Sequence, residues 1–190
     1  IYNLFQFIMG SGYGNKFLVQ RYIKPYNDMY ILDIGCGTAS ILDYFPENIQ
    51  YFGFDPNPCY IEHAKKKYPT RGQFMCEVVE RFHITNPTSF DLVLAKGILH
   101  HLDDVQVKTL TDLADVALKP GGRLITLDCC YISKQNPVAK FLIKKDRGKN
   151  VRTPDAYLNL VRKEFKIISS SIINYKFIPY TLFIMECQKS

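Results

Sequence analysis

Two glycines and an aspartate have the spacing of a nucleotide-binding site. Gly35 and Gly37 follow the apolar run Tyr30–Ile34, and Asp55 lies 20 residues after Gly35, at the end of a second apolar run. Glycines let the backbone turn sharply after a strand and approach a ligand closely, and an acid at about this separation accepts the two ribose hydroxyls. The pattern predicts a βαβ unit that binds a nucleotide. The alternative for Asp55 is a surface acid in a strand-to-helix turn.

A histidine pair follows a later apolar run, Phe90–Ala95. These are His100 and His101. Histidine is the side chain whose ordinary pKa lies nearest neutral pH, so we expect one of the two to act as a catalytic base where a proton must be removed. The alternative is that the pair caps or packs the next helix. No metal is expected, because the six cysteines form no CxxC pair and their spacing fits neither a zinc site nor a disulfide framework.

The elements that would hold these residues alternate between strand-like and helix-like segments, which is typical of a mainly parallel sheet. Asp103 or Asp104 caps a helix that must stop near Lys119, because Pro120-Gly121-Gly122 follows. The tail has two β-rich runs with no helix between them, so they are expected to pair antiparallel. The predicted strands are 30–34, 51–54, 73–76, 90–95, 123–128, 165–173 and 181–187, and two further helices are expected to start at Asn57 and Thr153.

The bulk composition fits one domain, 1–190. The 190 residues are 47% hydrophobic and 22% charged. No apolar run is long enough to cross a bilayer, and the first residues lack the basic leader and cleavage site of a signal peptide. Cysteines within apolar runs fit a reducing compartment. We therefore expect a cytoplasmic protein.

The net charge of +6 is gathered in one segment. Residues 134–152 hold seven basic residues and a single acid, Asp146, so the rest of the chain is neutral overall. A local patch is less specific for nucleic acid than a basic surface, so a nucleic-acid partner is not expected. The sequence makes no prediction of oligomeric state.

Four stretches, in order, resemble the class I S-adenosylmethionine-dependent methyltransferases, over roughly residues 15–190. They are Ile31–Ala39, Tyr51–Pro56, Phe90–Leu102 with its Leu-His-His-Leu, and Leu118–Leu124 with its Leu-Lys-Pro-Gly-Gly. The resemblance implies an α/β fold, a Rossmann-like three-layer sandwich on a seven-stranded, mostly parallel sheet with an antiparallel last strand. It also implies that S-adenosylmethionine is the cofactor and S-adenosylhomocysteine the product, with the sulfonium supplying the driving force.

The resemblance assigns cofactor-binding roles to individual residues. The backbone at Gly35, Cys36 and Gly37 would pass the methionine part of the cofactor. Asp33 would face the ammonium group through a water molecule, and Asp55 would bind the ribose. The remaining assignments are Pro56 or Asn57, Glu77 and Val78 beside the adenine, and Ala95, Lys96 and Gly97 beside the methionine.

Two residues depart from the family's pattern. Ala39 stands where the family usually has a third glycine, and its methyl group is expected to be tolerated with some shift of the turn. Lys96 is unusual beside a sulfonium, because like charges repel. It either points outward or binds the substrate or the cofactor carboxylate.

The acceptor implied by the resemblance is a small molecule. After the predicted strand 90–95 the chain has neither the Asn-Pro-Pro-Tyr motif nor the Pro-Cys motif that relatives use on nucleobases, and we expect no added RNA-binding module. The basic insertion, 131–152, suggests an anionic acceptor, although a solvated charged loop is the alternative. The helices of 1–24 are expected to form a lid, with Tyr13 either closing over the cofactor or packing on the sheet. The other functions left open are a non-catalytic cofactor-binding partner or sensor, a methyltransferase of protein or nucleic acid, and an NAD(P)-dependent oxidoreductase.

Overall fold

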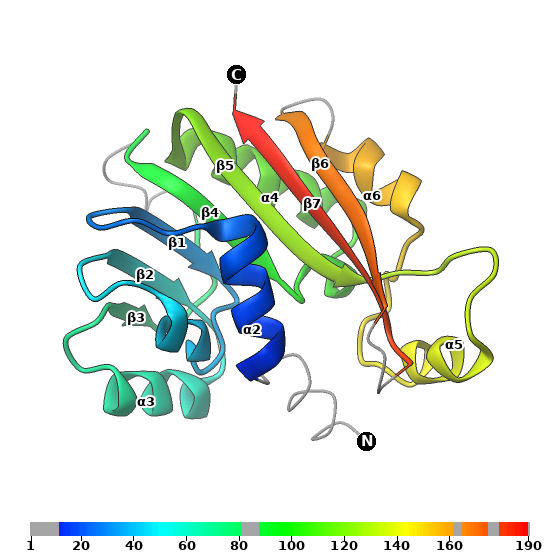
Figure 1. Cartoon of the computed structure of the whole chain (residues 1–190), viewed down its shortest axis with the longest axis horizontal. Coiled ribbons are helices and arrows are strands. Elements are labelled where there is room, and N and C mark those ends of the chain that lie inside the picture. Colours follow the sequence, from blue (N-terminus) through cyan, green and yellow to red (C-terminus); the bar gives the residue numbers. More distant parts are fainter. Residues whose placement is uncertain (1–11, 81–87, 162–164, 175–178, 190) are drawn as a thin grey trace.

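The computed structural model of the chain describes residues 12–80, 88–161, 165–174 and 179–189 (Figure 1). Seven strands form one sheet in the order β3-β2-β1-β4-β5-β7-β6. Six strands run parallel, and β7 runs antiparallel to both of its neighbours, β5 and β6. The strands are β1 Tyr30–Ile34, β2 Gln50–Phe54, β3 Gln73–Met75, β4 Phe90–Lys96, β5 Leu118–Cys129, β6 Phe165–Asn174 and β7 Thr181–Lys189.

The strand order fixes where a ligand can enter the sheet. From β1 the chain moves outward to β2 and β3, and it then returns to β4 on the other side of β1. Connections that leave two adjacent parallel strands in opposite directions open a crevice at the carboxyl ends of those strands. In this chain the crevice lies beyond Ile34 and Lys96, the last residues of β1 and β4.

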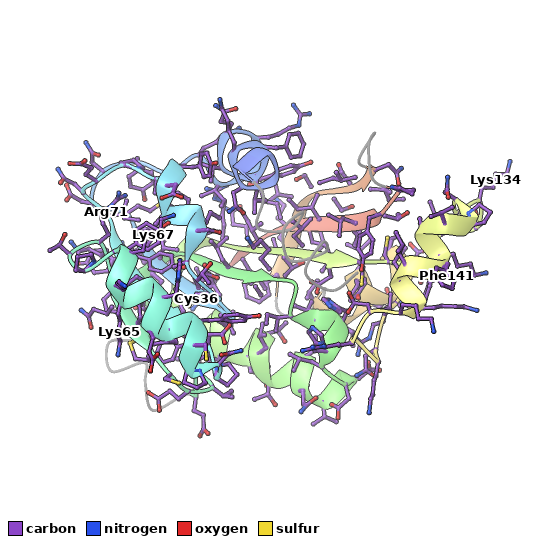
Figure 2. The ribbon with its side chains drawn as sticks, turned by 90° about the horizontal axis from the view of Figure 1, so that it is seen from below. Cys36, Lys65, Lys67, Arg71, Lys134 and Phe141 are labelled. Atoms are coloured by element: carbon purple, nitrogen blue, oxygen red, sulfur yellow. The ribbon has the colours of Figure 1, made fainter. Side chains whose placement is uncertain are left out.

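Helices cover both faces of the sheet and make three layers (Figure 1). One apolar core lies between the sheet and the group α2, η1, η2 and α3, and a second lies between the sheet and the pair α4 and α6. The short helix α5 lies at the end of the molecule away from α3, as the labelled Phe141 and Lys134 show (Figure 2). The helical segments are α2 Gly12–Leu18, η1 Val19–Ile23, η2 Ser40–Tyr44, α3 Pro58–Lys67, η4 Leu99–His101, α4 Asp104–Ala117, α5 Pro137–Lys144 and α6 Pro154–Val161.

The predicted fold is confirmed, including the antiparallel pairing of the last two β-rich runs. All six cysteines are free. Among the described helices, none is long and apolar enough to span a membrane.

The predicted start of the fifth strand was wrong. It begins at Leu118, directly after α4 ends at Ala117, and not at Arg123. The sequence Pro120-Gly121-Gly122 normally ends regular structure, but here Leu118 pairs with Phe90 across a register shift in β4. The side chain of Gln188 on β7 donates to the Gly121 carbonyl at 3.0 Å. Partners on both sides therefore keep the proline and glycines within the strand.

The helix after the histidine pair begins with reciprocal hydrogen bonds. The Asp103 carboxylate accepts the backbone N–H of Gln106 at 2.8 Å, and the Gln106 side chain accepts the N–H of Asp103 at 3.0 Å. This capping box fixes the first turn of α4, two residues after His101.

We expect Asp103→Ala to lower the free energy of unfolding by about 1 kcal/mol, because the backbone N–H of Gln106 loses its partner. Urea denaturation followed by circular dichroism measures the change. Asp112→Ala, on the exposed face of the same helix, removes only an ion pair with Lys108 and should cost no more than about 0.5 kcal/mol. Equal losses in the two variants would contradict the cap.

Candidate functional site

The turn after β1 combines a tight contact with an open space. Gly35 and Gly37 have positive φ angles, 73° and 56°. A Cβ on Gly35 would lie 2.1 Å from Cδ1 of Ile98, whereas a Cβ on Gly37 would meet no atom within 4 Å. The positive φ of Gly35 and its close contact with the Ile98 side chain both favour glycine there, and Gly37 borders a space that a ligand can fill.

Ala39 keeps the left-handed conformation of a glycine, with φ 52°. This conformation costs a residue with a Cβ about 1–2 kcal/mol. The methyl group of Ala39 is almost fully buried in the core beneath α2 and η2, which offsets part of that cost. The turn thus retains the backbone that a third glycine would give it.

Asp55 is bonded directly to the glycine turn. Its carboxylate accepts the backbone N–H of Gly37 at 3.0 Å and that of Asn57 at 2.8 Å. Asp55 is 9% exposed, so the carboxylate lies at the inner wall of the space beside Gly37. The two features whose spacing predicted a nucleotide site are in contact.

Asp33 is a buried carboxylate with one satisfied oxygen. Its Oδ2 accepts the Tyr51 hydroxyl at 2.5 Å, while Oδ1 has no hydrogen-bond partner among the described residues. Burial raises the pKa of Asp33 to about 6, although the Tyr51 hydroxyl and the Lys96 ammonium act in the opposite direction. An unpaired buried carboxylate oxygen is costly, and a cation that met it would be stabilised.

Lys96 points into the protein and not outward. Its ammonium donates to Oδ1 of Asn15 on α2 at 2.8 Å, and the Asn15 amide donates to Oγ of Ser40 at 3.1 Å. Burial lowers the pKa of Lys96, and the nearby Asp33 carboxylate opposes that change. The lysine thus joins the end of β4 to α2 on the side where the resemblance expects the methionine part of a cofactor.

The residues expected beside the adenine gather at the ends of β2 and β3. The backbone N–H of Asp55 donates to the Met75 carbonyl at 3.2 Å, and Sγ of Cys76 lies 3.9 Å from the Pro56 carbonyl oxygen. Glu77 and Val78 follow directly and are exposed. Their place beside the adenine remains a prediction.

His100 and His101 have different surroundings. His100 is buried, and its Nδ1 lies 2.8 Å from Oδ1 of Asp128, while His101 is exposed with its ring centroid 4.1 Å from that of His100. Burial opposes protonation of His100, but Asp128 and Asp146 outweigh it and raise its pKa to about 9. Burial and the neighbouring His100 lower the pKa of His101. The pair was predicted, but this division of environments was not.

Asp128 and Asp146 are the site residues that the sequence analysis missed. Asp128 lies near the end of β5, and Asp146 lies in the basic insertion, with an oxygen 3.5 Å from Nε2 of His100. The one available signal was that Asp146 is the single acid among the basic residues of 134–152.

One cation of the basic insertion supports the fold around the histidine pair. The Arg152 guanidinium donates to the carbonyls of Leu99 and Leu102 at 3.0 and 2.8 Å and pairs with Asp104 at 2.7 Å. The other basic side chains of the insertion, Lys134, Lys140, Lys144, Lys145, Arg147 and Lys149, are exposed.

The N-terminal segment is partly built into the core. Leu18, Val19, Tyr22 and Ile23 are buried, and the Arg123 guanidinium donates to the carbonyls of Tyr22 and Ile23. Residues 1–11 and the Tyr13 side chain lie outside the described part of the chain. The expected lid over 1–24 therefore remains a prediction.

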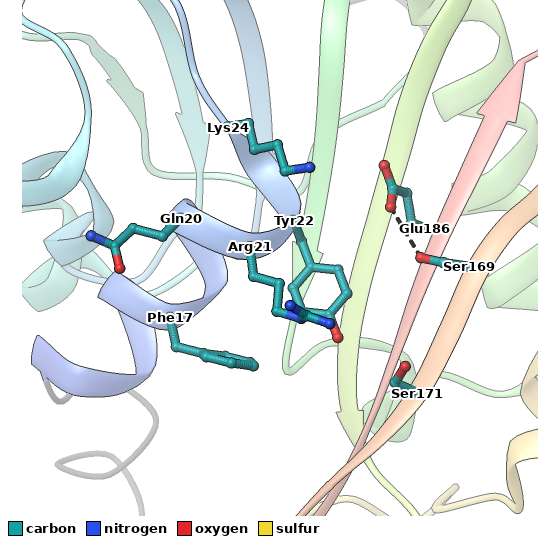
Figure 3. Close-up of a pocket in the computed structure, with 8 residues that line it drawn as sticks. All are labelled: Phe17, Gln20, Arg21, Tyr22, Lys24, Ser169, Ser171 and Glu186. Carbon is teal, nitrogen blue, oxygen red and sulfur yellow. Dashed lines mark hydrogen bonds between the residues drawn. The ribbon is translucent and has the colours of Figure 1, made fainter.

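A hollow of about 560 Å³ lies elsewhere, between the η1 region and strands β6 and β7 (Figure 3). Its wall includes the Glu186 carboxylate, which accepts the Ser169 hydroxyl at 3.0 Å and pairs with Arg123 at 2.7 Å. None of the predicted site residues lines it.

The family comparison agrees with the geometry at the glycine turn. The family model described as a methyltransferase domain matches residues 32–124, which include the glycine turn, Asp55 and the histidine pair. The matched family therefore extends over about half of the chain, and the seven-stranded fold is consistent with the S-adenosylmethionine-dependent methyltransferases. Methyltransferases of this family use S-adenosylmethionine as cofactor. No curated protein matches the sequence.

Solved structures share the fold of this chain at low sequence identity. A possible exported protein from Bordetella parapertussis is 16% identical with a TM-score of 0.71, and the match covers 92% of this chain but only 65% of that one. N-methyltransferase NodS from Bradyrhizobium japonicum WM9, in complex with S-adenosyl-L-homocysteine, is 14% identical with a TM-score of 0.66 over 86% of this chain and 79% of that chain. The Burkholderia thailandensis 1,6-didemethyltoxoflavin-N1-methyltransferase is 17% identical with a TM-score of 0.70 over 93% and 76%.

The open space at Gly37 generates a prediction with a matched control. Gly37→Ala should leave the methyltransferase folded, at a cost of about 1–2 kcal/mol for the left-handed alanine, but its methyl group should obstruct S-adenosylhomocysteine. Gly121→Ala, at φ 75°, imposes the same backbone strain far from the site. Calorimetric titration should show loss of binding in the first variant and wild-type affinity in the second. Unchanged affinity in Gly37→Ala would contradict the assignment of this space.

Proposed function

We propose that this methyltransferase transfers the methyl group of S-adenosylmethionine to a small-molecule acceptor that carries a negative charge. The observation that carries the proposal is the contact between the Asp55 carboxylate and the Gly37 N–H. It joins the acid expected at the ribose to the glycine turn expected at the methionine.

The residues at the crevice fit the cofactor in two further ways. The unpaired Oδ1 of Asp33 offers a buried acceptor to the cofactor's ammonium group, directly or through water. The open space at Gly37 leaves room for the methionine part of the cofactor. In this arrangement Asp55 would hold the ribose hydroxyls with the acceptor capacity left after its two backbone bonds. Pro56, Glu77 and Val78 would border the adenine, and Cys36, Ala95 and Gly97 would border the methionine.

Lys96 fits the cofactor as a partner of its carboxylate. The lysine lies on the same side as Asp33, whose carboxylate acts on its pKa, and its ammonium donates to Asn15. An ammonium and a carboxylate side by side match the two charged ends of an amino-acid moiety. The repulsion between Lys96 and the sulfonium is offset if the cofactor carboxylate lies between them.

Methyl transfer mainly requires that the acceptor atom, the methyl group and the sulfur be aligned. The bound sulfonium supplies the reactive methyl group, and the chain's residues need to orient the cofactor and acceptor and keep water out. The histidine pair follows β4 and lies next to Gly97, since a Cβ on Gly97 would be 3.9 Å from Cε1 of His100. We place the acceptor on this side, where one of His100 and His101 acts in catalysis.

A small anionic acceptor is supported by charge and by analogy. The exposed cations of 134–152 belong to the same insertion as Asp146, which approaches His100, and they would attract an anion. Solved structures of similar fold include enzymes that act on small molecules, among them the mitomycin 7-O-methyltransferase MmcR and the toxoflavin-pathway enzyme from Burkholderia. We also keep the prediction of a cytoplasmic location, which the free cysteines support.

The test is calorimetric titration with S-adenosylmethionine and S-adenosylhomocysteine. We expect micromolar binding, about −8 kcal/mol, by the wild type and a loss of roughly tenfold to a hundredfold in Asp55→Asn, because ribose hydroxyls lose a charged acceptor. Asp43→Asn is the matched control: its carboxylate pairs with Lys67 at 2.7 Å and takes no part in the proposed site. Absence of binding by the folded wild type would refute the function.

If the protein binds S-adenosylmethionine, it is then screened for methyl transfer to acceptors. Acceptors are offered as pairs that differ only in a carboxylate or phosphate and its neutral ester. The anionic member should have the higher kcat/KM, and added salt should reduce the difference. Transfer only to neutral members would contradict the charged acceptor, and no transfer by a cofactor-binding protein would favour the non-catalytic alternative.

The pKa of Asp33 predicts a pH dependence of cofactor binding. With a pKa of about 6, Asp33 is ionised above pH 6 and takes up a proton as the pH falls through that value. The affinity for S-adenosylhomocysteine should therefore be constant near neutral pH and decrease below pH 6, approaching tenfold per pH unit. Calorimetry between pH 5 and pH 8 measures it. In Asp33→Asn the affinity should be lower throughout and the decrease should disappear; a decrease that persists in the variant would assign it to another group.

A further inference from the structure

Three side chains that could bind a metal ion converge beside the proposed acceptor position. Within the described residues, His100, His101 and Asp146 each offer one ligand atom, and these atoms lie within 4.8 Å of one another. The two histidines belong to η4, after β4, and Asp146 follows α5 in the basic insertion. The fold thus brings a carboxylate to the histidine pair from 45 residues further along the chain.

His100 has the orientation of a metal-ligating histidine. Its Nδ1 is bonded to Asp128 at 2.8 Å, which leaves Nε2 as the atom that faces Asp146. A carboxylate on the far nitrogen is the usual support of a histidine ligand, because it fixes the ring and its tautomer. His100 is 2% exposed, and its Nε2 is buried without a hydrogen-bond partner among the described residues.

The separation between Nε2 of His100 and Oδ1 of Asp146 suits a bound metal ion better than a hydrogen bond. Nε2 of His100 lies 3.5 Å from Oδ1 of Asp146, which is longer than a normal N–H···O hydrogen bond of about 2.7–3.2 Å. A tetrahedral ion with bonds of about 2.1 Å holds its nitrogen and oxygen ligands about 3.4 Å apart. A metal ion therefore needs little movement of either side chain.

Asp146 is also held in place from behind. The Tyr180 hydroxyl donates to its Oδ2 at 3.1 Å, and the N–H of Gly148 donates to Oδ1 at 2.9 Å. Gly148 packs so closely on His100 that a Cβ would lie 2.1 Å from Cδ2 of the ring, and the Asn150 N–H donates to the His100 carbonyl at 2.9 Å. The ligand positions are thus fixed by neighbours that would remain in place with an ion bound.

We propose that His100, His101 and Asp146 bind a divalent transition-metal ion at the acceptor side of the methyltransferase. Two imidazoles and one carboxylate suit ions such as Zn²⁺, Mn²⁺ or Fe²⁺ better than Mg²⁺ or Ca²⁺, which prefer oxygen ligands throughout. Three protein ligands leave at least one coordination position for another molecule. This departs from the expectation of no metal, which rested on cysteine spacing alone.

The ion would bind and activate the acceptor. This role rests on the proposed methyl transfer, but the proposal that the chain binds an ion does not. An acceptor hydroxyl on the metal loses its proton to solvent more readily. Its oxygen then forms a bond to the methyl carbon as the carbon–sulfur bond breaks and its electron pair returns to sulfur. The products are the methyl ether and neutral S-adenosylhomocysteine. The histidines would then serve as metal ligands and not as the base.

The test uses Co²⁺ as a probe on the full chain after treatment with a chelator. We expect one Co²⁺ per chain with visible ligand-field bands, and competition by Zn²⁺. His101→Ala is the main variant because His101 is exposed, and Asp146→Asn is the second; each should weaken Co²⁺ binding at least tenfold. His63→Ala removes an exposed histidine of α3 and should bind like the wild type. Near-ultraviolet circular dichroism shows whether each variant is folded.

Three results would overturn the proposal. They are no Co²⁺ binding by the folded wild type, binding unchanged in folded His101→Ala and Asp146→Asn, and thiolate-to-cobalt charge-transfer bands, which would assign the ion to cysteines. Titration of the same preparation with S-adenosylhomocysteine separates this proposal from the proposed function. Metal without cofactor binding would refute the function alone, and cofactor without metal binding would leave His100 in an ion-pair network between Asp128 and Asp146.

Discussion

The hydrogen bonds from Gly37 and Asn57 to the Asp55 carboxylate are the constraint on which the site depends. They tie the end of β2 to the turn after β1, where Gly35 packs closely against the Ile98 side chain that follows β4. The parallel arrangement brings all three strand ends to one edge of the sheet. A carboxylate, backbone N–H groups and an open space therefore meet where the strand order opens a crevice.

Buried charge on either side of this turn divides the crevice into two regions. On one side Asp33 and Lys96 lie under α2, where burial raises the pKa of the acid and lowers that of the lysine. On the other side Asp128 and Asp146 flank His100 and raise its pKa. Burying charges costs free energy unless they are paired, so both regions favour ligands that complete the pairing. An amino-acid moiety suits the first region, and a cation suits the second.

The sequence predicted what short-range patterns determine. The strands followed from apolar runs, the helix starts from their capping residues, and the nucleotide site from the spacing of Asp55 and the glycine turn within one βαβ unit. It placed the start of the fifth strand five residues too late, because the pairing of Leu118 with Phe90 keeps Pro120 in a strand despite its local preference. That pairing is set by tertiary contacts, which overrule local signals.

The surroundings of the histidine pair could not be predicted from the sequence, because they too depend on tertiary contacts. His100 and His101 are adjacent in the chain, but only the packing of Gly148 and the return of the insertion bury one and leave the other exposed. Asp128 reaches His100 through the pairing of β4 with β5. The unusual position of Asp146 among basic residues was visible in the sequence, whereas its partner was not.

The most direct test of this account is a crystal structure of the chain with S-adenosylhomocysteine. The account predicts both ribose hydroxyls on the Asp55 carboxylate, the methionine part passing Gly37, and the ammonium group within reach of Oδ1 of Asp33, directly or through one water molecule. Ligand bound elsewhere, for example in the hollow beside Glu186, or bound at the crevice without contact to Asp55, would contradict it.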